Sequence, residues 1–419
     1  MTMLQGVNLV RKESKAQAGF RIITYTRLGA PIVLRWMADA GSLRDPLSSP
    51  GLMHFMEHGL MAGTSRLKNK QEMALALEKW GISPNAFTSS SSLAVTLSSG
   101  FPEALPDMIG LMLEVVFDAQ FRSGAIENER SVILQEQRRK QNSLATFAQE
   151  EWRRLLYKGS GVEGSTLGTA EAVSAISVEQ LRDAYQTHIP LVSNTLLVLG
   201  DIDHEKVVAE VNQQMAVWSD RVVKKDLVEP DILPFTQVAR AEIAVEGAKG
   251  VELVLGWRIP AVAGRQYAAS RLLSSIMVGG QASRLYRKLR GEMGAVYSVS
   301  MHRYQFSDSD LVMISTNASK EEIQKVEPAI AEVLRGSVGT ITQAELDRSR
   351  MRIQGNLRGQ YEEIEQVASI IGVDEMRGFG SSRIEEFYEL LPTITLEEVH
   401  DLLSFYLEQP SATVLLGNI

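Results

Sequence analysis

The chain has 419 residues and no cysteine, and this absence excludes disulfides, iron–sulfur clusters, thiolate zinc sites and cysteine nucleophiles. It also lacks an apolar run of about 18 residues, so no membrane-spanning helix is expected. No block of lysine and arginine stands out in a chain of net charge −8, which argues against a nucleic-acid partner. The N-terminus lacks the basic stretch and apolar core of a secretory signal. We therefore expect a cytoplasmic chain or a trimmed mature form.

Histidine is scarce, with six in the chain, yet two of them lie four residues apart. His54 and His58 belong to the pattern His-x-x-Glu-His, in which Glu57 precedes the second histidine. On a helix this spacing places both imidazoles on one face, where they are able to hold one zinc ion. A water activated by zinc needs a base such as this glutamate to attack at neutral pH. The alternative is that the two histidines simply lie on an exposed polar face of a helix. The glutamate directly before the second histidine favours a zinc site instead.

A catalytic zinc has three protein ligands, and without cysteine the third must be histidine, aspartate or glutamate. Two glutamates on a charged helical segment are more attractive candidates than the other histidines, because Glu129 and Glu136 are seven residues apart and share a helix face. The alternative is that this segment is an ordinary charged helix exposed to solvent. One would bind the metal while the other orients a ligand, and spacing alone does not choose between them. The remaining histidines form no comparable cluster; they are His188, His204, His302 and His400.

Strand-like and helix-like segments alternate along the chain, which favours an α+β fold. Residues 22–26 and 31–37 predict a hairpin, and residues 87–98 predict one strand rich in serine and threonine. Helical spacing of apolar residues predicts helices over 70–80 and 127–141.

Two parts of the chain, half its length apart, resemble each other. Residues 176–184 match 394–402 as helices that begin with a Ser or Thr cap, and each is followed by a similar closing strand. This duplication predicts two homologous domains, 1–222 and 235–419, joined by a polar, proline-containing linker at 223–234.

The sequence resembles the pitrilysin family of zinc metallopeptidases, the inverzincins, which includes insulin-degrading enzyme and mitochondrial processing peptidase. The resemblance covers nearly the whole chain. Its parts are Asp39-Ala-Gly-Ser, Gly51-Leu-Met-His-Phe-Met-Glu-His, Gly63-Thr64, Asn85-Ala-Phe-Thr, Glu129-Arg-Ser-Val-Ile-Leu-Gln-Glu136, Leu199-Gly-Asp201, Ser283-Arg-Leu-Tyr-Arg-Lys-Leu-Arg290 and Gly294-Ala-Val-Tyr297. Two places depart from the family pattern: Gly59-Leu60 replaces a bulkier apolar pair, and Ser89-Ser-Ser-Ser-Leu replaces a more β-prone strand.

The resemblance implies a metal site with one Zn²⁺ per chain. His54, His58 and Glu136 would be its ligands, Glu57 the general base, and Glu129 a supporting carboxylate.

The resemblance also implies two groups that hold the substrate. Asn85, Ala86 and Phe87 would form an edge strand that binds an extended peptide through its main chain. Arg290 and Tyr297 would contact the substrate main chain and help to polarise the scissile carbonyl.

The implied fold has two homologous domains, each an antiparallel sheet with helices packed on one face, and forms half of a four-domain clam-shell chamber. The implied function is a zinc metalloendopeptidase that cleaves short unfolded peptides in a dimeric chamber. We expect a homodimer because one chain carries both the metal motif and the arginine–tyrosine pair. A heterodimer with a metal-less homologue is the alternative assembly. The alternative is a non-catalytic scaffold or partner subunit of a peptidase or respiratory complex, while Glu57 argues against zinc storage.

Overall fold

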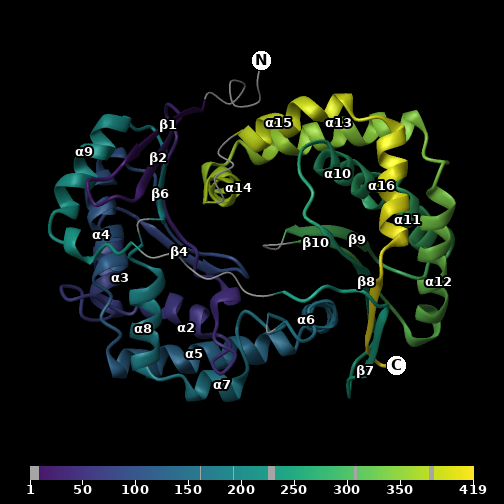
Figure 1. The fold of residues 1–419 in the computed structure, drawn as a ribbon, viewed down its shortest axis with the longest axis horizontal. Coiled ribbons are helices and arrows are strands. Elements are labelled where there is room, and N and C mark those ends of the chain that lie inside the picture. The colour runs from purple at the N-terminus through teal and green to yellow at the C-terminus, as the bar shows by residue number, and fades with distance from the viewer. Residues whose placement is uncertain (1–8, 161, 192, 225–231, 306–308, 377–381) are drawn as a thin grey trace. The chain divides into compact units, whose positions relative to one another are not determined.

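The chain forms two compact units, each built on one sheet (Figure 1). The structure is a computed structural model that describes residues 9–160, 162–191, 193–224, 232–305, 309–376 and 382–419. The first unit comprises Met1–Gln137, Ser165–Pro230 and Gly359–Glu385, and the second comprises Arg138–Gly164, Asp231–Arg358 and Glu386–Ile419. Two sheets with many helices confirm the predicted α+β class.

The sheet of the first unit has six strands in the order β1-β2-β6-β3-β5-β4. The β2–β6 pair is parallel and the other neighbours are antiparallel. The strands are β1 (Val10–Lys15), β2 (Arg21–Thr26), β3 (Ile32–Ala38), β4 (Ser83–Thr88), β5 (Leu93–Ser99) and β6 (Thr195–Gly200).

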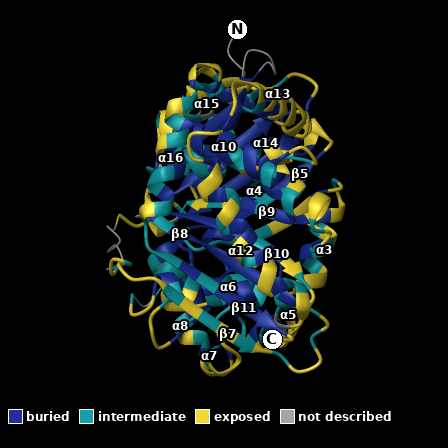
Figure 2. Cartoon of the chain, turned by 90° about the vertical axis from the view of Figure 1, so that its right-hand side faces the viewer, coloured by how far each residue is buried: buried dark blue, intermediate teal, exposed yellow. Residues whose placement is uncertain are grey.

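The sheet of the second unit has five strands in the order β7-β11-β8-β10-β9, with β7 and β11 parallel. Its strands are β7 (Ala239–Ala244), β8 (Val251–Pro260), β9 (Val299–Gln305), β10 (Ser309–Ala318) and β11 (Ser411–Gly417). The central strands β8 and β10 are buried over most of their length (Figure 2). The predicted antiparallel sheets are therefore observed with one parallel pair in each.

Helices cover one face of the first sheet because their apolar stripes share a core with alternate strand residues such as Leu34 and Trp36. The helical elements of this unit are η1 (Ser42–Arg44), α2 (Leu52–Leu60), α3 (Lys70–Glu78), η2 (Pro102–Ala104), α4 (Leu105–Phe117), α5 (Ser123–Gln141), α7 (Ala170–Ala175), α8 (Val178–His188), α9 (His204–Met215), η3 (Ser219–Arg221) and α14 (Ile364–Met376). Unlike α2 and α4, helix α14 lies on the opposite face, against β3 and β6.

The second unit also has a helix from the other half of the chain, because α6 packs on β8 and β11. Trp152 of α6 donates its indole N–H to the carbonyl oxygen of Ala412 at 2.9 Å. The helical elements of this unit are α6 (Leu144–Leu156), α10 (Gly264–Val278), α11 (Arg284–Tyr286), the π-helical turn η4 (Arg287–Glu292), α12 (Lys320–Ser337), α13 (Gln343–Gln360), α15 (Ser382–Leu390), η5 (Leu391–Thr393) and α16 (Leu396–Glu408).

The predicted domain boundaries at 1–222 and 235–419 differ from the compact units, which exchange α6 and α14 across them. Most of the predicted linker, residues 225–231, lies outside the described residues. In the described chain, no helix combines the length and apolar character needed to cross a membrane.

Two predicted local structures are wrong. Strands β2 and β3 do not form a hairpin, because β6 lies between them and pairs with both. Residues 87–98 are not one strand but the end of β4, a turn and most of β5. The turn forms because Ser89 bonds Ser92 through both main chain and side chain, with its N–H donating to the Ser92 carbonyl at 2.8 Å.

The predicted caps of the repeated helices are confirmed. Ser177 begins α8 and Thr395 begins α16, and each forms a capping box with the third helical residue, Gln180 or Glu398. The closing strands β6 and β11 follow these helices.

Candidate metal centre

Helix α2 carries the His-x-x-Glu-His pattern, and its N-terminus is fixed by the loop before it. Asp45 accepts hydrogen bonds from the main-chain N–H groups of Gly51 at 2.7 Å and Met53 at 2.8 Å. Burial raises the pKa of this carboxyl to about 7 despite these bonds. Gly51 has φ +92°, and a Cβ there would lie 2.7 Å from the carbonyl oxygen of Leu167, so only glycine fits.

The two histidines of α2 point their Nε2 atoms toward one carboxylate oxygen. The Oε2 atom of Glu136 on α5 lies 3.8 Å from His54 Nε2 and 3.6 Å from His58 Nε2. The ligand atoms around a tetrahedral zinc are separated by roughly 3.3–3.6 Å when each lies about 2.0–2.2 Å from the metal. The two imidazoles and Glu136 therefore fit a zinc ion with little movement.

Glu129 lies on the other side of His58, next to Nδ1, and does not face the two Nε2 atoms. Its Oε2 atom is 3.2 Å from His58 Nδ1, and its Oε1 atom is 2.6 Å from the Nζ of Lys70, the first residue of α3. Burial lowers the pKa of His58, but the neighbouring carboxylates, Glu129 foremost, outweigh it and raise the pKa. Burial likewise raises the pKa of Glu129, but bonds from His58 and Lys70 outweigh it and lower the pKa. Of the two glutamates that spacing left open, Glu136 faces both Nε2 atoms and Glu129 orients one ring.

Glu57 is buried beside the histidines. His54, Glu57 and His58 each offer a ligand-type atom, and these atoms lie within 4.8 Å of one another. Glu57 accepts a hydrogen bond from the Oγ1 of Thr88 at 2.6 Å. Burial is the main reason that the pKa of Glu57 is raised. Thr88 ends β4, so the carboxylate that the sequence predicts as the base is tied to the edge of the sheet.

Strand β4 is an edge strand, and among the described strands it pairs with β5 alone. Ala86 packs toward the core with α2, and alternation along the strand places Asn85 and Phe87 on the opposite face. The segment predicted to hold substrate thus has an open edge beside the metal helix.

Arg290 and Tyr297 lie in the second unit and contact each other. Arg290 Nη1 donates to the main-chain carbonyl oxygen of Tyr297 at 2.6 Å, and its guanidinium carbon lies 4.7 Å from the centre of the Tyr297 ring. Tyr297 is 76% exposed and Arg290 is also exposed, so both residues present donors to solvent. Arg290 belongs to η4, a rare π-helical turn of the kind that often marks functional sites.

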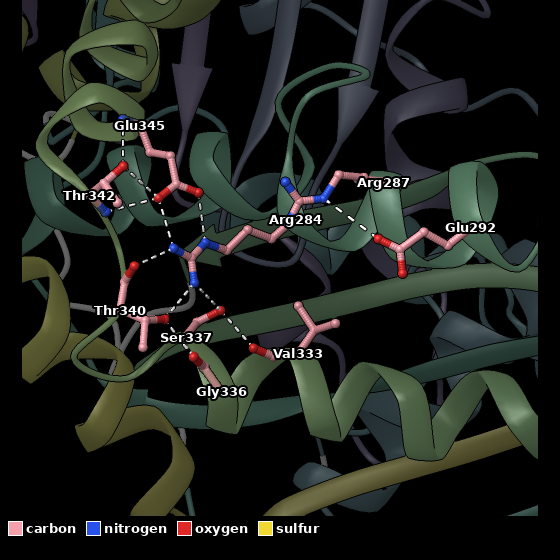
Figure 3. Close-up of polar contacts among 9 residues, drawn as sticks. All are labelled: Arg284, Arg287, Glu292, Val333, Gly336, Ser337, Thr340, Thr342 and Glu345. Atoms are coloured by element: carbon pink, nitrogen blue, oxygen red, sulfur yellow. Dashed lines mark hydrogen bonds and ion pairs between the residues drawn. The ribbon is translucent and has the colours of Figure 1, made fainter.

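The segment that carries Arg290 is anchored by Arg284 (Figure 3). Arg284 donates to both carboxylate oxygens of Glu345 at 2.7 Å, to the Thr340 side chain at 2.8 Å and main chain at 2.6 Å, and to Ser337 at 3.2 Å. These bonds use all five N–H groups of the guanidinium. The start of α11, and with it the π-helical turn, is thereby fixed to the ends of α12 and α13.

Other histidines have separate surroundings. His204 bonds Thr24 and Ser14 at 2.8 Å each, and His400 accepts from the Gly339 N–H at 2.9 Å. Gly59, which differs from the bulkier residue of the family pattern, is required here by packing. A Cβ at this position would lie 2.4 Å from the ring of Phe121.

Two contributing residues were missed in the sequence. Thr88 stands in the quoted segment Asn85-Ala-Phe-Thr, so its position beside Glu57 had a signal in the motif. No sequence motif pointed to Lys70, because a lysine at the start of a helix is common and only the fold brings it to Glu129.

Histidines four apart, a buried glutamate between them and a glutamate from a second helix define the site class of the inverted His-x-x-Glu-His zinc peptidases. The family profile described as "Insulinase (Peptidase family M16)" matches residues 34–170, and "Peptidase M16 inactive domain" matches residues 175–353. The chain belongs to peptidase family M16, and the resemblance inferred from the sequence is confirmed.

Two relatives with zinc protease in their names match most of this chain. The chain is 21% identical to an "Uncharacterized zinc protease" of Rickettsia felis, over 96% of this chain and 97% of the relative. It is 25% identical to another from Mycobacterium leprae, over 90% of this chain and 84% of the relative.

Solved structures share the fold over nearly the whole chain. A protease from Helicobacter pylori matches with a TM-score of 0.88 and 18% identity, over 98% of this chain and 99% of that one. The first half of the periplasmic protease PqqL from Escherichia coli matches with a TM-score of 0.80 and 19% identity, over 98% and 92% of the two chains. In the whole PqqL chain, with a TM-score of 0.80 and 17% identity, the match covers 98% of this chain but 48% of that chain.

Proposed function

We propose that the protein is a zinc-dependent endopeptidase that cleaves short unfolded peptides. The observation that carries this proposal is the convergence of both His Nε2 atoms on Glu136, with Glu57 beside them and bonded to the edge strand through Thr88. His54, His58 and Glu136 would hold one Zn²⁺ per chain. When bound, zinc activates a water and polarises a carbonyl.

The protein groups supply the remaining chemistry. Strand β4 binds the peptide in extended form along its open edge, so that the scissile bond is presented beside α2. Glu57 takes the proton of the attacking water and passes it to the leaving amine. Arg290 and Tyr297 donate hydrogen bonds where negative charge develops on the carbonyl oxygen.

We further propose that two chains form the working chamber. The chain is similar to one half of the longer PqqL protease, which supports the idea that a second copy supplies the other half. In a homodimer each chain would give its metal site to the chamber and its arginine–tyrosine pair to the site of its partner. A heterodimer with a metal-less homologue is the alternative.

The decisive experiment replaces Glu57 by Gln. The variant should keep one zinc per chain, measured by metal analysis, and lose hydrolysis of a quenched-fluorescent peptide library on the order of 10³-fold or more. Glu103→Gln, an exposed glutamate in η2, is the matched control and should be fully active. Undiminished turnover in Glu57→Gln would overturn the mechanism, and a wild-type chain that neither binds zinc nor cleaves peptides would favour the scaffold function.

A further inference from the structure

Arg35 lies in the middle of β3, on the sheet face turned away from the metal helix. Its neighbours in the strand, Leu34 and Trp36, point into the core, while Arg35 lies beneath α14 and is 5% exposed. Gly372 of α14 makes room for it, because a Cβ there would lie 3.3 Å from Arg35 Nε. The charged side chain is thus enclosed between the sheet and a helix.

No carboxylate compensates this buried charge among the residues that the structure describes. Arg35 Nη1 donates to the hydroxyls of Ser369 at 3.2 Å and Thr96 at 3.5 Å, and within the described part of the chain Nε has no hydrogen-bond partner. Burial accordingly lowers the pKa of Arg35. Elsewhere on α14 the contrast is clear, since buried Glu375 accepts from Arg11 Nε at 2.6 Å. A buried charge without a counterion destabilises a fold, so its presence requires an explanation.

The guanidinium of Arg35 reaches toward the open edge of the sheet. Its central carbon lies 5.2 Å from the ring centre of Phe87 on β4. The pairing register places Arg35, Thr96 and Asn85 in one row across β3, β5 and β4. The face that carries the charge is therefore also the face of Asn85 and Phe87.

A peptide strand added to the free edge of β4 would lie about 4.8 Å beyond Phe87. Every second peptide side chain would then point to the face that Arg35 occupies. We propose that Arg35 makes the edge strand select peptides with an acidic side chain on this face, which would approach the guanidinium across Phe87. This inference rests on the proposed peptidase function and adds a substrate class to it.

Its negative charge makes glutamate a preferred side chain at such a position. In the partly buried surroundings of the strand, attraction between unlike charges is stronger than in water. Glutamine has the same shape without the charge, and lysine would be repelled. We expect a glutamate peptide to be favoured over its glutamine counterpart by about tenfold in kcat/KM, equivalent to about 1.4 kcal/mol.

The experiment compares peptides that carry Glu, Gln or Lys at each position around one cleavage site. Wild-type protein should prefer Glu over Gln at positions that alternate along the peptide. Arg35→Met, which keeps the length of the side chain, should reduce the ratio to about one, and Arg35→Lys should restore part of it. Arg348→Met makes the same change at an exposed arginine of α13 and should leave the ratio unchanged.

Two further measurements separate selectivity from folding and from turnover. Arg35→Met should unfold at the same or a higher temperature than wild type, because a buried unpaired charge has been removed. Binding of labelled Glu and Gln peptides to Glu57→Gln, with and without Arg35→Met, measures the preference without hydrolysis. A wild type without the preference, or an Arg35→Met variant that retains it, would overturn the proposal. Absent hydrolysis with the binding preference intact would count against the peptidase function alone.

Discussion

The two units share a scaffold and differ in chemistry. Strand order β2-β6-β3-β5-β4 in the first unit matches β7-β11-β8-β10-β9 in the second, with a parallel pair at the same place. The closing strands end alike: Gly200 has φ +137° and Gly417 has φ +141°, and a Cβ on either would collide with the backbone at the start of the neighbouring strand.

The candidate functional residues are distributed unequally between the two units. Helix α2 follows β3 and carries His54, Glu57 and His58, whereas α10 follows β8 and contains no histidine, aspartate or glutamate. The second unit instead presents Arg290 and Tyr297. The fold therefore does not need the metal residues, which mark one unit as the candidate metal-binding half.

One ion pair nevertheless has the same place in both units. A basic residue at the first position of a helix ahead of the edge strand pairs with a glutamate on a later long helix. In the first unit the pair is Lys70 with Glu129, and in the second it is Arg284 with Glu345. The first pair supports a histidine and the second supports the segment of Arg290.

The largest effect should come from the candidate metal-binding half. Glu136→Ala removes the carboxylate on which both Nε2 atoms converge, so bound zinc and peptide hydrolysis should both fall on the order of 10³-fold. Metal analysis and turnover measure the two losses. Glu127→Ala, an exposed residue of the same helix, is the control. Full zinc occupancy in Glu136→Ala would assign the third ligand elsewhere.

A smaller effect is expected in the other half, and it should separate metal from catalysis. Arg290→Ala should lower kcat/KM about 10²-fold because a donor to the developing oxyanion is lost, while one zinc per chain is retained. Arg287→Ala removes a neighbouring exposed arginine of the same turn, paired only loosely with Glu292 at 3.8 Å, and should be nearly silent. Equal losses in the two variants would contradict a specific role for Arg290.

The smallest effect concerns the anchor of the π-helical turn. Bonds from Arg284 hold the pKa of Glu345 down to about 2. A lowered carboxyl pKa stabilises the fold above the ordinary glutamate pKa, and this contribution disappears as pH falls toward 2. Glu345→Gln should therefore lower the free energy of unfolding by about 1 kcal/mol at pH 7, and by progressively less between pH 5 and about 3.

Urea unfolding at several pH values measures this difference. Glu332→Gln, an exposed residue of α12, is the control and should show no comparable trend. A gap between wild type and Glu345→Gln that stays constant down to pH 3 would show that the ion pair is not its cause.

Local signals in the sequence predicted local structure well. The His-x-x-Glu-His spacing, the Ser and Thr caps and the matched halves depend on residues close together in the chain, and the helices, caps and repeated strands follow from them. The β2–β3 hairpin failed because β6, over 150 residues later, takes the place between the two strands.

The sequence predicted the candidate site only where the contacting residues belong to one local motif. Glu136 and Glu129 have equivalent positions on the helix, and their different roles emerge only from which imidazole nitrogen each one faces. Arg35 gave no signal either, because a single arginine in an apolar strand suggests a solvent-facing residue until α14 covers it.

The exchange of α6 and α14 between the units has a consequence for synthesis on the ribosome. The sheet of the first unit is complete once β6 has emerged, but its cover, α14, is made more than 160 residues later. Until then β3 and β6 expose the face that α14 later covers. Helix α6 likewise has no partner to pack against until β8 and β11 have been synthesised. The nascent chain should therefore stay vulnerable to aggregation and dependent on chaperones until nearly all of it has been translated.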